Sequence, residues 1–146
     1  MIITFCGHRD FFGNTELKER LVNELVIRAK QTEILFCYSG GYGGFDRFAA
    51  HCVKEAQRQI NNIRNCLVIP YLTQSLQEQY NGYFDEIIYP PLEKVPARYA
   101  IIRRNEWMVD QADLLIAYVT HGWGGAARTL QYAKRKNIPI LTLYEL

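Results

Sequence analysis

Ser39-Gly40-Gly41-Tyr42-Gly43-Gly44-Phe45-Asp46 is the stretch of sequence that decides the fold. It follows residues 33–38, a mostly apolar run that predicts a buried strand, and leads into residues 45–60, where apolar side chains recur at helical spacing. A glycine-rich turn between a strand and a helix is typical of phosphate binding, because glycines let the backbone approach an anion and helix-start amides favour negative charge. The spacing matches neither a Walker loop nor the GxGxxG dinucleotide motif.

The same alternation of strand and helix runs along the whole chain. Several of the strands are near-continuous apolar runs, which is typical of a parallel sheet covered by helices on both faces. We therefore predict an α/β fold: a single Rossmann-like, three-layer domain over residues 1–146 with a mainly parallel sheet of five to six strands. The stretch 73–83 is polar and has only a weak helical pattern. The other expected strands are 2–6, 66–69, 86–89, 114–119 and 138–143, and the other expected helices are 15–30, 97–111 and 124–136.

Length and composition are those of one ordinary globular domain, with 146 residues, 49% of them hydrophobic and 22% charged. A net charge of +2 is not the concentrated basic face of a general nucleic-acid binder, so nucleic acid is not expected as a partner. No run approaches the roughly 20 apolar residues that cross a bilayer, so no membrane partner is expected. The first apolar run is also too short for a signal peptide.

The four cysteines lack the paired spacing of a zinc site, and three of them lie in or beside apolar runs. We interpret them as small, buried, reduced thiols, which favours a cytoplasmic location. With three histidines in the chain, no metal centre is expected, and no cofactor is predicted. The cysteines are Cys6, Cys37, Cys52 and Cys66.

Three further segments are expected to join the first glycine loop. Gly7, His8 and Arg9 come directly after the first predicted strand, and Arg9 suits a two-pronged contact with phosphate. Residues 121–129 form a second glycine-rich link between strand and helix, where Trp123 could stack on a base. One arginine of the helix 97–111 could also reach a phosphate, because ligands bind outside the carboxyl ends of parallel strands. The predicted ligand-binding residues are Gly7, His8, Arg9, Ser39, Gly40, Gly41, Gly43, Gly44, Asp46, Arg104, Asn105, His121, Gly122, Trp123, Gly124, Gly125, Arg128 and Thr129.

Four motifs in this order resemble the SLOG superfamily, above all its small bacterial and phage branch. That superfamily joins the DNA-processing protein A (Smf) family and the LOG family. The resemblance implies a Rossmannoid fold that binds a nucleotide or a nucleotide-derived small molecule, and pairing as a homodimer. The motifs are Gly7-His8-Arg9, Ser39-Gly40-Gly41 leading to Asp46 and His51, Arg104-Asn105 leading to Asp110 and Asp113, and Gly124-Gly125 leading to Thr129 and Tyr132-Ala133.

Within that resemblance three functions stay open. The first is binding or sensing of a nucleotide derivative, such as an ADP-ribose type molecule. The second is the LOG activity, a phosphoribohydrolase that releases the base of a nucleoside monophosphate, for which Arg104 matches the LOG arginine. Gln131 stands near the glutamate of the LOG loop PGGxGTxxE, and a glutamine cannot act as acid or base. The third is single-stranded nucleic-acid binding, as in the DNA-processing branch. No catalytic residue is identified, and the carboxylates that hydrolysis would need are Asp46, Glu106 or Asp113.

Overall fold

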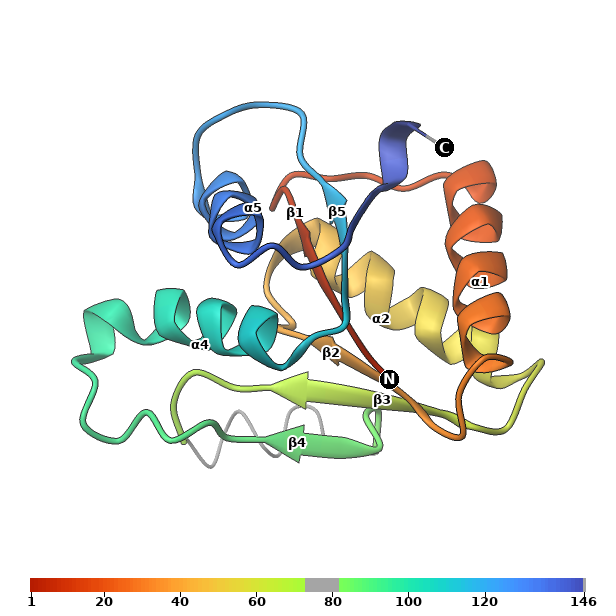
Figure 1. The fold of residues 1–146 in the computed structure, drawn as a ribbon, viewed down its shortest axis with the longest axis horizontal. Helices are drawn as coiled ribbons and strands as arrows, with labels where there is room; N and C mark the ends of the chain where they lie inside the picture. The colour runs from red at the N-terminus through yellow and green to blue at the C-terminus, as the bar shows by residue number, and fades with distance from the viewer. Residues whose placement is uncertain (73–81, 146) are drawn as a thin grey trace.

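The computed structural model describes residues 1–72 and 82–145 and alternates strands with helices along them (Figure 1). The polar stretch 73–83, for which a weak helical pattern was noted, lies mostly outside the described residues. The strands are β1 (Ile2–Gly7), β2 (Leu35–Ser39), β3 (Ile63–Val68), β4 (Glu86–Ile88), β5 (Leu114–Tyr118) and β6 (Ile140–Thr142). The helices are α1 (Thr15–Ala29), α2 (Gly43–Gln57), α4 (Ala97–Gln111), α5 (Gly125–Arg135) and the 3-10 helix η1 (Leu143–Glu145).

The six strands form one sheet in the order β4-β3-β2-β1-β5-β6, and every neighbouring pair in it is parallel. The chain therefore builds outward from β1 through β2 and β3 to β4, and then crosses to β5 and β6 on the other side. The predicted Rossmann-like α/β fold is confirmed. In such a sheet the crevice for ligands lies where the order reverses, which here is between β1 and β5.

Helices cover both faces of the sheet, α1 and α2 on one side and α4 and α5 on the other (Figure 1). Successive residues of β1 supply the two cores in turn, because side chains alternate across a strand. Ile3 and Phe5 pack with α1 and α2, whereas Cys6 packs with Val109 and Ala133 of α4 and α5. This three-layer arrangement leaves the loops after the strands as the main open edge.

Local signals place several element ends where the sequence predicts them. Asn14 caps α1, because its Oδ1 accepts a hydrogen bond from the N–H of Leu17 at 2.8 Å. Strand β3 begins at Ile63, earlier than the predicted 66–69, since residues 63–65 already pair with β2.

All four cysteines are free and buried. None of the described helices is long and apolar enough to cross a membrane.

Candidate functional site

A cavity of about 480 Å³ opens at the carboxyl ends of β1 and β5, where the strand order reverses. It brings together most of the motifs that the sequence singled out. The predicted residues that line it are Gly7, His8, Arg9, Asp46, Arg104, Asn105, His121, Trp123, Gly124, Gly125 and Thr129. Those that do not line it are Ser39, Gly40, Gly41, Gly43, Gly44, Gly122 and Arg128.

The first glycine loop packs closely against the segment after β1, and its predicted role as a phosphate cradle stays a prediction. The amides at the start of α2 are already used: Gly44 donates to the carbonyl of Arg9 at 2.7 Å and Phe45 donates to that of His8 at 3.3 Å. A Cβ at Gly44 would collide with the Phe11 carbonyl oxygen, and one at Gly43, where φ is +87°, would lie 2.8 Å from the Cα of Arg9. These glycines let the β1–α1 loop lie directly on α2.

Arg104 fills the space beside the same loop and is 1% exposed. Its Nη1 donates to the carbonyls of Gly40 at 3.0 Å and Val68 at 2.8 Å, and its Nε donates to Asn105 Oδ1 at 2.8 Å. Gly40 has to lack a side chain, because a Cβ there would lie 2.8 Å from the guanidinium carbon. The arginine thus ties α4 to the ends of β2 and β3, a structural role that the sequence did not reveal.

Asp46 is half-buried in the first turn of α2 and lines the cavity. Its Oδ2 accepts a hydrogen bond from the backbone N–H of Tyr42 at 3.1 Å. Burial raises the pKa of Asp46 to about 6, although the Tyr42 hydrogen bond and the charge of Arg104 act in the opposite direction. The cavity therefore contains a carboxyl group that titrates near neutral pH.

The second glycine loop has the open backbone that the first one lacks. In the part of the chain that the structure describes, no atom would lie within 4 Å of a Cβ at Gly122, Gly124 or Gly125. Helix α5 begins at Gly125 with no side-chain cap and no acidic residue in its first turn. Among the described residues no group accepts a hydrogen bond from the N–H of Gly125 or Ala126, both of which line the cavity. Open helix-start amides and the helix dipole favour a nearby negative charge.

Three stacked rings fix the orientation of Trp123. His8 stacks on His121 at a centroid distance of 3.7 Å, and His121 stacks on Trp123 at 3.7 Å. His8 Nε2 accepts the N–H of Thr120 at 2.8 Å, while burial and the neighbouring His121 lower the pKa of His8, so the imidazole is neutral. Trp123 is 72% exposed at the outer end of the stack. It presents an anchored aromatic surface beside the α5 amides.

Two of the three candidate carboxylates lie away from the cavity, and their catalytic candidacy stays a prediction. Asp113 accepts the N–H of Ile2 at 2.8 Å, at the amino edge of the sheet. Glu106 pairs with Arg103 at 3.4 Å and does not line the cavity. Of the predicted carboxylates, only Asp46 remains in the site.

The sequence also missed several lining residues, of which two follow from a visible signal. Ile101 and Met108 share one side of α4 with Arg104 and Asn105, at spacings of three or four residues. Once Arg104 is assigned to the site, this helical spacing is enough to find them. The other missed lining residues are Phe5, Cys6, Asp10, Tyr42 and Ala126.

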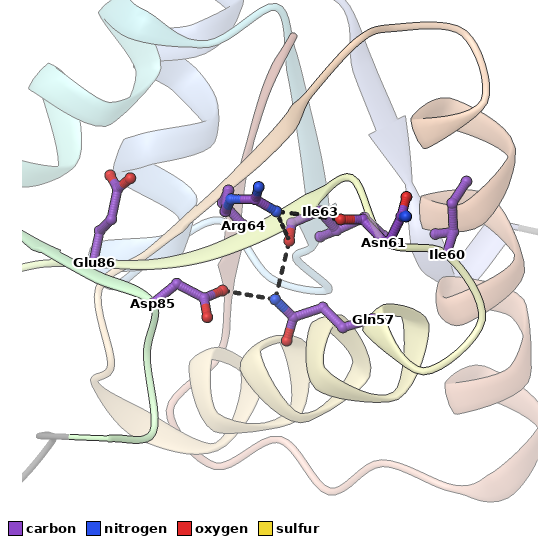
Figure 2. Close-up of a pocket in the computed structure, with 7 residues that line it drawn as sticks. All are labelled: Gln57, Ile60, Asn61, Ile63, Arg64, Asp85 and Glu86. Carbon is purple, nitrogen blue, oxygen red and sulfur yellow. Dashed lines mark hydrogen bonds between the residues drawn. The ribbon is translucent and has the colours of Figure 1, made fainter.

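A second hollow of about 450 Å³ lies at the amino ends of β3 and β4 (Figure 2). Its polar groups bond to one another: Gln57 Nε2 donates to Asp85 Oδ2 at 2.6 Å, and Arg64 Nη1 donates to the carbonyl of Asn61 at 3.3 Å. The amino edge is the one that parallel sheets do not use for ligands. The cavity between β1 and β5 is therefore the candidate functional site.

No family model and no curated protein matches the sequence. Several solved structures, however, share its fold. DNA processing protein A from Helicobacter pylori is similar with a TM-score of 0.62 and 15% identity, over 96% of this chain and 63% of that chain. The chain has the fold of DNA processing protein A. This chain spans less than two thirds of the length of the Helicobacter pylori protein, which binds single-stranded DNA.

Proteins that bind the molybdenum cofactor share the fold as well. The molybdenum cofactor binding protein of Rippkaea orientalis gives a TM-score of 0.61 at 17% identity, over 95% of this chain and 73% of that chain. The Moco carrier protein of Chlamydomonas reinhardtii gives 0.53 at 18% identity, over 95% and 72%. The predicted Rossmann-like α/β fold is thus shared with these proteins. The prediction that nucleic acid is not a partner gains no support, since one of these proteins binds DNA.

Proposed function

We propose that this chain binds a nucleotide or a nucleotide-derived small molecule in the cavity between β1 and β5. One observation carries the proposal: the first-turn amides of α5, at Gly125 and Ala126, face the cavity with no acceptor among the described residues. A phosphate group is the ligand that such a helix start favours. Trp123 adds an exposed ring next to the amides, on which a base can stack.

The test is titration calorimetry with AMP, ADP and ADP-ribose on the wild type and on Ala126→Glu. The new carboxylate would occupy the anion position and repel phosphate, while its place at a helix start favours folding. We expect binding to the wild type and a loss of at least about tenfold in the variant, since a charge-assisted contact is removed. Gln131→Glu is the control, because it makes the same charge change on an exposed part of α5 outside the cavity. Equal loss in both variants would contradict the assignment.

Single-stranded nucleic acid is the second candidate ligand, favoured by the fold shared with DNA processing protein A. Exposed aromatic side chains at the same edge suit base stacking, above all Phe12 at 91% and Trp123 at 72% exposure. Fluorescence anisotropy with a labelled oligothymidine at two salt concentrations tests this candidate. Binding that weakens steeply with salt supports it, and no binding at physiological salt contradicts it.

The phosphoribohydrolase alternative depends on a carboxyl group in the cavity, which is lined by Asp46 and by Asp10. Asp46 is the only predicted carboxylate in the cavity, and its pKa of about 6 suits a group that exchanges protons near neutral pH. Incubation with nucleoside monophosphates and chromatography for the free base tests the activity. Base release that disappears in Asp46→Asn supports hydrolysis, and no release from a bound nucleotide leaves binding as the function.

A further inference from the structure

The carboxyl group of Asp46 offers the cavity an unused hydrogen-bond acceptor. Its Oδ2 is held by the Tyr42 N–H at 3.1 Å, and no described residue donates to Oδ1. The side chain is half-buried and lines the cavity, and Oδ1 is not one of the fully buried side-chain atoms without a partner, so a ligand can reach it. A ligand donor that replaces water at this oxygen forms a charge-assisted hydrogen bond.

The neighbouring arginine does not satisfy this carboxyl group. Arg104 forms no ion pair with Asp46 within 4.0 Å in the described part of the chain. Its Nη1 and Nε are committed to Gly40, Val68 and Asn105. The positive charge nearby favours the ionised carboxylate, yet no described residue gives Oδ1 a direct hydrogen bond.

The cavity is therefore lined by groups of opposite preference, a carboxylate and an open helix start. Asp46 belongs to α2, which covers one face of the sheet, and the open amides belong to α5, which covers the other. A phosphate is attracted by the amides of Gly125 and Ala126 and repelled by the carboxylate, because like charges a few ångströms apart interact unfavourably in a partly buried site. The charge pattern gives a bound molecule one orientation.

We propose that Asp46 determines specificity by accepting a hydrogen bond from a hydroxyl or amine of the ligand. The site then selects phosphorylated molecules that carry such a donor at the end away from the phosphate, and discriminates against inorganic phosphate. This inference rests on the proposed function. In a nucleotide the donor comes from the ribose hydroxyls or from an amine of the base, and the experiment separates these two sources.

The experiment is titration calorimetry on the wild type with AMP, 2′-deoxy-AMP, purine riboside monophosphate, which lacks the base amine, and inorganic phosphate. We expect AMP to bind at least about tenfold more tightly than one of the two analogues, as the loss of a hydrogen bond to a charged group predicts. Loss with the deoxy analogue assigns the donor to the ribose, and loss with the purine analogue assigns it to the base. If both analogues and AMP bind within about twofold of one another, the inference is overturned.

Asp46→Asn tests the same contact from the protein side. The amide oxygen can still accept from Tyr42, which turns an N–H₂ toward the ligand donor, so the preference for AMP over the sensitive analogue should disappear. Inorganic phosphate should bind the variant no worse than the wild type, since a repelling charge is removed. Glu106→Gln is the matched control, a half-buried carboxylate outside the cavity.

The outcomes separate this inference from the proposed function. Unchanged discrimination in a folded Asp46→Asn variant overturns the role of Asp46 and leaves nucleotide binding intact. No binding of any nucleotide to the wild type overturns the proposed function itself. Because the comparison of analogues uses the wild type alone, an unstable variant does not remove the test.

Discussion

Arg104→Ala is expected to destabilise the fold more than any surface substitution near the site. The side chain is 1% exposed and donates to the carbonyls of Gly40 and Val68 and to Asn105. Truncation leaves buried acceptors without a donor, each at about 1–3 kcal/mol, and opens a void. We expect the free energy of unfolding to fall by about 3–5 kcal/mol, the range found when one partner of a buried polar network is removed.

Urea denaturation followed by circular dichroism measures this loss, and a melting temperature lower by roughly 10 °C should accompany it. Arg103→Ala is the control, because Arg103 is the adjacent arginine with a 62% exposed side chain and a surface ion pair to Glu106. It should cost less than about 1 kcal/mol. A folded Arg104→Ala variant that loses less than about 1 kcal/mol of stability but most of its nucleotide affinity would refute the reasoning. Arg104 would then be a ligand contact, as the sequence predicted, and not a structural tie.

The remaining predictions concern the two glycine loops, the stacked rings and pH. Gly44→Ala should destabilise the fold, because its new Cβ would collide with the Phe11 carbonyl oxygen. Gly122→Ala is the control and should leave the melting temperature nearly unchanged, because its Cβ enters open space. Equal melting temperatures for the two variants would contradict this contrast. Trp123→Ala should weaken nucleotide binding by about 1–3 kcal/mol, the worth of a base–aromatic stack, with Tyr99→Ala on α4 as the exposed control in calorimetry. Stability should also depend on the protonation of Asp46, whose pKa is raised from 3.8 to about 6 in the folded chain. The folded state therefore binds this proton more tightly than the unfolded state. The contribution of Asp46 to the free energy of unfolding should rise as pH falls from above 6 toward 4. Melting curves at several pH values should show this contribution in the wild type and not in Asp46→Asn, and parallel pH profiles would argue against it.

The fold was predictable because its signals are local. Alternating apolar runs and helical stretches, with Asn14 as a cap, specify the elements and their class. The start of β3 was missed because Arg64 and Asn65 interrupt the apolar pattern. Pairing with β2 outweighs that local composition, since residues 63–65 join the ladder beside residues 35–37.

The roles of the two glycine loops could not be separated in the same way. Gly43-Gly44 and Gly124-Gly125 have the same local form, each between a strand and a helix. What distinguishes them is a distant segment: residues 8–11 lie on the first loop and use its amides, whereas no segment among the described residues lies on the second. The burial of Arg104 was hidden for the same reason, because its acceptors at Gly40 and Val68 are far away in sequence.

The central position of β1 also shapes how the chain folds during synthesis. This strand leaves the ribosome before the other five strands of the sheet, but one of its two partners, β5, is made only after β2, β3 and β4, and Ile3 pairs with Leu114. Until then one long edge of β1 lacks its hydrogen-bonding neighbour, and the apolar face beneath α4 and α5 lacks its cover. Pairing between strands that are far apart in sequence slows folding and leaves aggregation-prone intermediates exposed. We therefore expect β1, the strand beside the cavity, to be a preferred binding segment for chaperones that act on nascent chains.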